Sequence, residues 1–204
     1  KIIYMEIIVH RANKTKILKN LNPSFGIEID VRDYGKNLII HHDPFKTGLL
    51  LNNFLSHYRQ KGLLLVDVKS EGIEYQILKV FKKFKIKKFF FLNSTYPMIL
   101  NLAKKNRYKN FIRVSDYESF ENIYKLKNNI KWIWLEIFDK LNITKKQILY
   151  LKNNKIKICL VSPELHGGNL KDIFKIQKIV NDNKIKIDAV CVKQKFIKYW
   201  DQAS

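Results

Sequence analysis

Short apolar runs alternate along the chain with longer segments whose apolar residues recur at helical spacing. The short runs are rich in Ile, Val and Phe, and this composition predicts β-strands. Eight such runs occur, at Met5–His10, Phe25–Val31, Leu63–Val68, Lys88–Leu92, Phe111–Ser115, Trp132–Glu136, Lys157–Val161 and Asp188–Val192. The predicted helices fall between them, at Leu50–Gln60, Ile73–Phe84, Tyr96–Asn106, Tyr117–Leu126, Thr144–Asn153 and Leu170–Asn183, with a weaker pattern at Lys14–Asn20.

This alternation indicates βαβ units and therefore an α/β fold with a parallel sheet. Eight units in a row favour a closed (β/α)₈ TIM barrel, for which a chain of 204 residues is near the lower end of the usual size. A doubly wound open sheet gives the same alternation and remains an alternative. The apolar segment Asn37–His42 follows a turn-like stretch at Gly35 and predicts a small insertion after the second strand. No linker divides the chain, so we expect one domain over residues 1–204.

Composition excludes several classes of protein. At 46% hydrophobic residues the chain has enough apolar material for a sizeable core, which excludes extended disorder. No apolar run approaches the roughly 20 residues of a transmembrane helix. Cys159 and Cys191 both lie in strand-like runs, as buried thiols of a reducing compartment do, so we expect a cytoplasmic protein. The chain starts at Lys1, and the sequence leaves an upstream targeting segment open.

The formal charge is strongly positive, at +21 from 39 Lys and Arg against 18 Asp and Glu. The excess is mostly Lys and is spread over the whole chain, beside many Asn and Ile, as a genome rich in A and T would produce. The charge favours a phosphate-bearing ligand and permits peripheral contact with an anionic membrane. A nucleic-acid-binding domain is a rival interpretation, but it leaves the ordered motifs described next without a role.

Ionisable residues mark the ends of the first predicted strands. They are His10 and Arg11, then Glu28 and Asp30, then His42 after the insertion, then Asp67 and Lys69. Side chains two apart on a strand share a face, and the carboxyl ends of barrel strands form the rim where active sites lie. Later strands end near Arg113, Glu136 and Glu164, which we treat as candidate substrate-binding residues.

Three carboxylates on adjacent strands repel one another unless a cation joins them. Glu28, Asp30 and Asp67 therefore predict a site for one divalent cation, Mg²⁺ or Ca²⁺, since both prefer oxygen ligands. The alternative is that these acids pair with Arg11, Arg32 and Lys69. Two histidines beside such a site can carry protons near neutral pH, and the nearby cations suit a phosphate. The pattern indicates cleavage of a phosphodiester.

The four motifs together resemble the glycerophosphodiester phosphodiesterases, TIM barrels of the phospholipase C-like superfamily. The resemblance rests on the pair His10-Arg11, the run from Gly26 to Arg32, the run from Leu38 to Asp43, and the run from Leu65 to Lys69. It implies a phosphoric diester hydrolase of lipid metabolism that acts on a small or lipid-derived diester. The implied roles are acid and base for His10 and His42, metal ligands for Glu28, Asp30 and Asp67, and phosphate binding for Arg11 and Lys69. His41 is then structural.

The sequence departs from the family pattern at several places. Ala12 stands where Gly is usual, Asp67 stands where Glu is usual, and the segment between His42 and Asp67 is short. The last strand lacks the usual Thr-Asp ending. These differences leave the acid, base and metal residues in place but weaken the prediction of a glycerol substrate. A rival interpretation is a phosphate- or glycan-phosphate-binding protein that keeps the fold without turnover.

Overall fold

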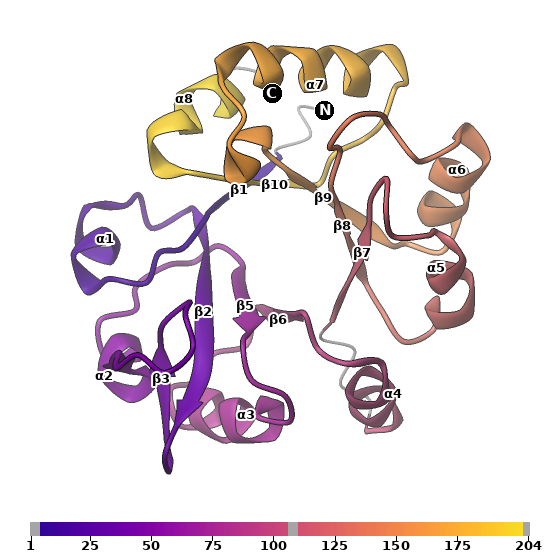
Figure 1. Cartoon of the computed structure of the whole chain (residues 1–204). Coiled ribbons are helices and arrows are strands. Elements are labelled where there is room, and N and C mark those ends of the chain that lie inside the picture. The colour runs from indigo at the N-terminus through magenta and orange to yellow at the C-terminus, as the bar shows by residue number, and fades with distance from the viewer. Residues whose placement is uncertain (1–4, 106–109, 202–204) are drawn as a thin grey trace. The chain divides into compact units, whose positions relative to one another are not determined.

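The computed structural model describes residues 5–105 and 110–201. They form two compact units, an N-terminal unit over Ile8–Lys109 and a C-terminal unit over Asn110–Ser204 together with Lys1–Ile7. Strand β1 (Glu6–Val9) contributes residues to both units. Figure 1 shows the order of the elements. The prediction of a single domain stays a prediction.

The N-terminal unit is built on parallel strands. Beside β1, these are β2 (Gly26–Tyr34), β5 (Leu64–Val68) and β6 (Phe89–Leu92), and β2 pairs in parallel with both β1 and β5. The predicted insertion is confirmed: β3 (Asn37–Ile40) pairs antiparallel with β2. An additional short strand, β4 (Leu49–Leu50), pairs antiparallel with β3 and was not predicted.

Four helices connect these strands: α1 (Thr15–Asn20), α2 (Leu51–Leu55), α3 (Glu74–Lys83) and α4 (Tyr96–Lys104). Helix α2 is shorter than the predicted Leu50–Gln60. The hydroxyl of Ser56 donates to the Asn53 carbonyl, which the His57 ring also contacts, and such local side-chain bonds compete with continuation of a helix. The predicted end of α4, at Asn106, lies outside the described residues.

The C-terminal unit repeats the alternation. Its parallel strands are β7 (Phe111–Val114), β8 (Trp132–Leu135), β9 (Lys157–Val161) and β10 (Ala189–Val192). Its helices are α5 (Glu121–Leu126), α6 (Lys145–Asn153), α7 (Leu170–Asp182) and α8 (Ile197–Trp200), with 3₁₀ turns η1 (Pro163–His166) and η2 (Gln194–Phe196). Helix α8 and the two 3₁₀ turns were not predicted, because each is too short to show a helical period.

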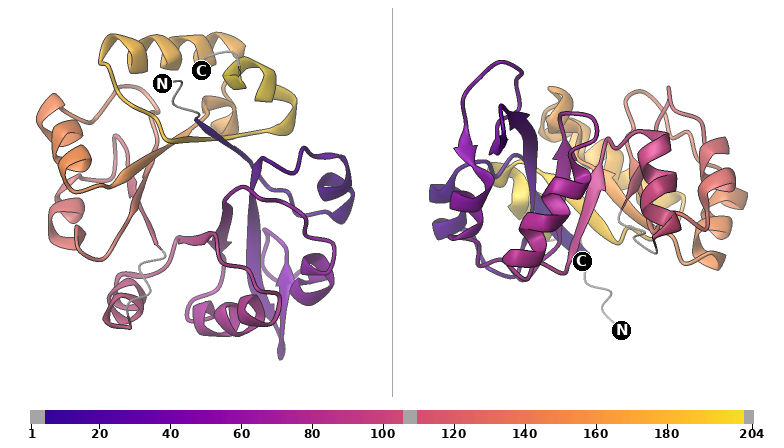
Figure 2. Two further views of the ribbon diagram at one scale, coloured as in Figure 1. Left: turned by 180° about the vertical axis from the view of Figure 1, so that it is seen from behind. Right: turned by 90° about the horizontal axis from the view of Figure 1, so that it is seen from below.

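Burial explains why the strands read as continuous apolar runs. All residues of β5, β8 and β10 are buried, as expected for parallel strands that are covered on both faces. Helices cover one face within each unit, as Figure 2 shows. Helix α3 illustrates the packing, since Ile77 and Phe81 lie four residues apart on its buried side.

The prediction of an α/β fold with parallel strands is confirmed, while closure into a barrel stays a prediction. Cys159 and Cys191 are both free and buried, as the sequence indicated. No helix among the described residues combines the length and the apolar character needed to cross a bilayer.

Gly62 sits where two chain segments approach closely. A Cβ at Gly62 would lie 2.2 Å from the Gly26 nitrogen and 2.3 Å from the Phe25 carbonyl carbon, and backbone atoms cannot move aside easily. We expect Gly62→Ala to lower the free energy of unfolding by about 1–3 kcal/mol through overpacking, measured by urea denaturation.

Gly35→Asn serves as the control. Gly35 has φ +60 with nothing within 4 Å of an added Cβ, and Asn tolerates this conformation. Equal stability of the two variants would show that the close approach at Gly62 is not a constraint.

Candidate active site

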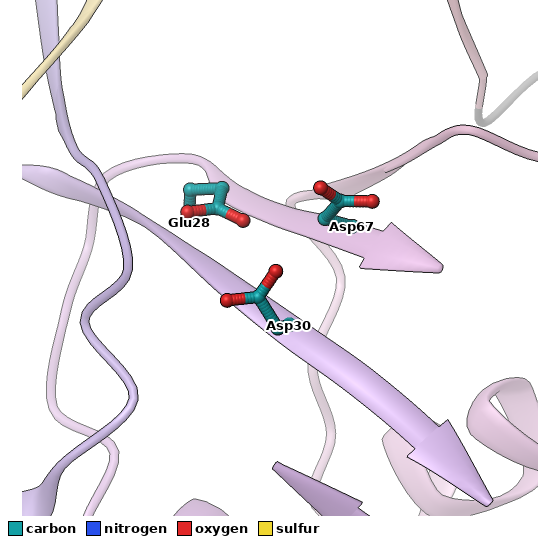
Figure 3. A group of neighbouring side chains, drawn as sticks. All are labelled: Glu28, Asp30 and Asp67. Atoms are coloured by element: carbon teal, nitrogen blue, oxygen red, sulfur yellow. The ribbon is translucent and has the colours of Figure 1, made fainter. Parts of the chain in front are cut away.

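Three carboxylates meet on neighbouring strands of the N-terminal unit. Glu28 and Asp30 lie two apart on β2, so they share a face, and Asp30 pairs in register with Asp67 of β5. One carboxylate oxygen from each residue lies within 4.8 Å of the others, as drawn in Figure 3. No second group of this kind occurs among residues 5–105 and 110–201. The strand register alone therefore brings the three predicted ligands together.

Burial makes this arrangement electrostatically costly. All three carboxylates are buried, with Asp30 at 0% exposure. Burial, followed by the charges of Asp30 and Asp67, raises the pKa of Glu28 well above its ordinary value. Burial also raises the pKa of Asp67. Burial thus destabilises the charged forms of Glu28 and Asp67.

The turn after β1 supplies contacts to Glu28. His10 directly follows β1, and its Nε2 lies 3.8 Å from Glu28 Oε2. Arg11 adopts a positive φ of 49°, and its backbone N–H donates to the same oxygen at 2.6 Å. The Arg11 side chain is 48% exposed, with Nε 3.8 Å from Asp30 Oδ2. His10 and Arg11 therefore lie beside the acids, as the sequence predicted.

Lys69 joins the other two acids. Its Nζ lies 2.6 Å from Asp67 Oδ2 and 3.2 Å from Asp30 Oδ1. Burial alone would lower the pKa of Lys69, but the Asp67 carboxylate outweighs it and the pKa is raised. Asn93, at φ +62 after β6, donates from Nδ2 to Asp67 Oδ1 at 2.8 Å. Lys69 and Asn93 thus each bind one oxygen of Asp67, the residue that replaces the longer Glu of the family pattern.

The acids fit a hard divalent cation. Buried Asp30 Oδ1 faces Lys69 Nζ at 3.2 Å, and the same Nζ also pairs with Asp67, so one charge serves two carboxylates. The donor set is three carboxylate oxygens, which Mg²⁺ and Ca²⁺ both prefer. Of the three cations that the alternative interpretation paired with the acids, Lys69 and Arg11 lie beside them, although Arg11 is 48% exposed and 3.8 Å from Asp30. Arg32 lies elsewhere. Its guanidinium donates to the carbonyls of His41 and His42.

His42 belongs to the loop that Arg32 holds. Its Nδ1 lies 2.7 Å from Asp43 Oδ1, and this hydrogen bond lowers the pKa of Asp43. An ionised carboxylate only accepts, so Nδ1 carries the proton and Nε2 is the atom available for proton transfer. The His41 ring instead accepts from the Asp43 N–H through Nδ1. His41 thus binds its own loop, which agrees with its predicted structural role.

The predicted residues of the C-terminal unit form two networks of their own. Arg113 donates to Glu136 at 2.6 Å, and Trp134 Nε1 donates to the other Glu136 oxygen at 2.8 Å. Burial raises the pKa of Glu136, but the hydrogen bond from His166 and the charge of Arg113 outweigh it, so the pKa is lowered. A part for Arg113 and Glu136 in substrate binding stays a prediction.

Glu164 is buried in the second network. It accepts from the Ser162 hydroxyl and from the Lys193 N–H at 2.9 Å. Trp200 Nε1 in turn donates to Ser162 Oγ at 2.8 Å. These bonds connect η1 to the segment after β10, and a substrate role for Glu164 stays a prediction.

Sequence reasoning missed three polar residues of the candidate active site. The signal for Asp43 is its place directly after His42 in the His-Asp motif. The signal for Asn93 is its place directly after the predicted strand Lys88–Leu92. Asn13 donates to Asp30, and nothing in its local sequence distinguishes it from the many other Asn residues.

Comparisons with solved structures identify the fold. A glycerophosphodiester phosphodiesterase from Thermotoga maritima matches with a TM-score of 0.68 at 16% identity, over 96% of this chain and 98% of that one. A phosphodiesterase from Oleispira antarctica, solved with the product sn-glycerol-3-phosphate, matches with a TM-score of 0.67 at 14% identity, over 98% and 97%. The chain has the fold of the glycerophosphodiester phosphodiesterases.

A further match to this phosphodiesterase fold comes from Agrobacterium tumefaciens, with a TM-score of 0.64 at 13% identity over 92% of this chain and 96% of that one. No protein-family model and no curated protein matches the sequence. The resemblance noted in the motifs is thus confirmed at the level of the fold. The phosphodiesterase fold extends over nearly the whole chain, beyond the stretch that carries the motifs.

The raised pKa of Glu28 predicts how stability depends on pH when chelator is present. Because the folded-state pKa lies above the ordinary 4.5, stability falls as pH rises from 4.5 through the folded-state pKa. Glu28→Gln removes this penalty, so the variant should be more stable than the wild type at pH 8. Urea unfolding at pH 5.5 and 8 measures both.

Added Mg²⁺ provides the control for this experiment. It should stabilise the wild type at pH 8 and leave Glu28→Gln nearly unchanged, because the variant lacks one ligand. If the free energy of unfolding in chelator depends on pH in the same way for the wild type and for Glu28→Gln, burial does not destabilise the charged form of Glu28.

The Arg113–Glu136 pair predicts a second stability effect. The Glu136 side chain is 2% exposed, so Arg113→Met leaves a buried carboxylate without its cation. We expect a loss of about 2–3 kcal/mol, somewhat below the full range because Arg113 itself is partly exposed. The exposed pair of Lys178 and Asp182 is the control, where Lys178→Met should cost under about 0.5 kcal/mol in the same urea titration. Equal losses of stability in Arg113→Met and Lys178→Met would show that Arg113 does not stabilise the buried Glu136 carboxylate.

Proposed function

We propose that the protein is a metal-dependent phosphodiesterase that hydrolyses a glycerophosphodiester or a related diester. The observation that carries the proposal is the cluster of Glu28, Asp30 and Asp67 beside His10 and Lys69, on a phosphodiesterase fold. Hydrolysis fits this set because it needs a site for the phosphate charge and groups that move protons. The proposal keeps the closed barrel that the sequence pattern predicts.

Two cationic side chains suit the phosphate. Arg11 is half exposed beside Asp30, so its guanidinium can bind phosphoryl oxygens through two N–H groups. Lys69 supplies a point charge between Asp30 and Asp67. A divalent cation held by the three acids would neutralise charge that develops on the phosphoryl oxygens. Arg11 and Lys69 then hold the diester in line for attack.

Two histidines suit the proton transfers. One imidazole accepts a proton from water as the water oxygen bonds to phosphorus, and the other donates a proton to the alcohol oxygen as its bond to phosphorus breaks. His42 is oriented for this work, since Asp43 holds Nδ1 and leaves Nε2 available. His10 is 16% exposed and lies beside Glu28. After the products leave, the histidine that accepted a proton releases it to solvent water and the histidine that donated one takes a proton from solvent, so both return to their starting states.

One of the relatives supports a choice for the alcohol part of the substrate. The Oleispira antarctica phosphodiesterase binds sn-glycerol-3-phosphate, which supports a diester that contains glycerol phosphate. The short segment between His42 and Asp67 leaves a wider range of alcohols open to this chain. The two free buried cysteines agree with a reducing cytoplasmic compartment, which we include in the proposal.

Hydrolysis assays test the proposal. Glycerophosphodiesters and bis(p-nitrophenyl) phosphate are supplied with Mg²⁺, Ca²⁺ or chelator, and turnover should require the cation. His10→Ala and His42→Ala should each lower kcat by about 10²–10⁴-fold, because each removes one proton carrier.

His57→Ala is the matched control, since the His57 ring contacts the Asn53 carbonyl and the Ser56 hydroxyl at the end of its own helix and is not part of the candidate site. Turnover that survives chelator, or that is unchanged in both active-site variants, would contradict the proposal. Cation binding without turnover of any diester would favour a phosphate-binding protein instead.

A further inference from the structure

The turn that follows β1 contacts β2 through more than its backbone. Asn13 comes three residues after His10, and its side chain makes two hydrogen bonds with Asp30. Its Nδ2 donates to Asp30 Oδ2 at 2.7 Å, and its Oδ1 accepts from the Asp30 N–H at 3.0 Å. One amide therefore binds both the backbone and the carboxylate of the same acid.

These two bonds fix the orientation of the Asp30 carboxylate. An Asp side chain normally rotates about its last torsion, and this rotation exchanges its two oxygens. With the N–H of Asp30 also bound, Asn13 places a donor at one defined side of the carboxylate. The Arg11 guanidinium approaches the same Oδ2, with Nε at 3.8 Å. The side chains of Asn13 and Arg11 thus both lie against Asp30 Oδ2.

The second oxygen of Asp30 is consequently left for the acid cluster. Asp30 Oδ1 is buried, and Lys69 Nζ lies 3.2 Å from it. Lys69 divides its single charge between this oxygen and Asp67 Oδ2, so the three buried carboxylates still carry more negative charge than Lys69 can balance. Carboxylates that bind a metal commonly use one oxygen as the ligand while a neighbouring group holds the other oxygen by a hydrogen bond. Asp30 is arranged in this way, with Oδ2 held by Asn13 and Oδ1 facing the acid cluster.

We propose that Asn13 is a positioning residue for the cation: it holds Asp30 Oδ2 so that Oδ1 faces the position shared with Glu28 and Asp67. The inference rests on the proposed function, because it assumes that the three acids bind a divalent cation. It assigns to Asn13 a role that neither the motifs nor the comparisons give it.

A neutral amide is well suited to this role. Three carboxylates already repel one another in the cluster, so a fourth charge beside Asp30 would add to the raised pKa values of its neighbours. Asn offers a donor for the carboxylate and an acceptor for the backbone on one short side chain. The Arg11 contact alone is longer, and the guanidinium is half exposed, so it fixes the carboxylate less firmly.

Titration of the chelator-treated protein with Mn²⁺, followed by isothermal titration calorimetry, tests the inference without any substrate. Asn13→Ala should weaken Mn²⁺ binding by about 10–100-fold, as loss of an outer hydrogen-bond partner typically does. The matched control is Asn22→Ala: Asn22 Oδ1 also accepts two hydrogen bonds, but they come from the N–H and hydroxyl of Ser24 and not from an acid of the cluster. Its Mn²⁺ affinity should stay within about twofold of the wild type.

Urea unfolding in chelator separates positioning from a general loss of structure. Both variants should lose a comparable amount of stability in chelator. Only Asn13→Ala should also lose affinity for Mn²⁺. If Asn13→Ala does not fold, Asn13→Gln takes its place: it keeps the amide one methylene further out, and its affinity should fall at least threefold. Unchanged Mn²⁺ affinity in the folded Asn13 variants would overturn this inference and leave the proposed function intact. A wild type that binds no Mn²⁺ would overturn both.

Discussion

Repulsion among three buried carboxylates is the constraint on which the candidate active site depends. Glu28, Asp30 and Asp67 place oxygens within 4.8 Å of one another where water cannot screen them. Chains tolerate such an arrangement when function requires it, since three apolar residues would be more stable in the same strands. The surrounding polar groups can all be understood as responses to it, from the Arg11 N–H on Glu28 to Lys69 between the two aspartates.

The strands set the distances between the three acids, and the turn after β1 sets how their carboxylates are oriented. Register between β2 and β5 brings Asp30 opposite Asp67 without any help from loops. The turn after β1 then adds donors, and it can do so because Arg11 accepts a positive φ that aims its N–H at Glu28. A rigid sheet thus sets the distances between the acids, while the turn sets how each carboxylate is oriented. Precision of this kind is what a site for a small cation needs.

Much of this arrangement could be predicted from sequence because strands follow a period of two. That period put Glu28 and Asp30 on one face, and strand order in a βαβ chain put Asp67 beside them. The turn contacts could not be predicted, since the backbone angle of Arg11 and the direction of the Asn13 side chain depend on tertiary packing. Arg32 shows the same limit: its charge suggested pairing with the acids, but the β2–β3 hairpin directs it to the His41 and His42 carbonyls.

The central claim is that the three acids hold one divalent cation. Anomalous diffraction from a crystal soaked in Mn²⁺ tests it most directly, because the signal locates the ion independently of any activity. We expect a single strong peak within about 2.0–2.3 Å of an oxygen from each of Glu28, Asp30 and Asp67, with Lys69 no longer between the aspartates. A peak elsewhere, or none while Lys69 stays between Asp30 and Asp67, would contradict it.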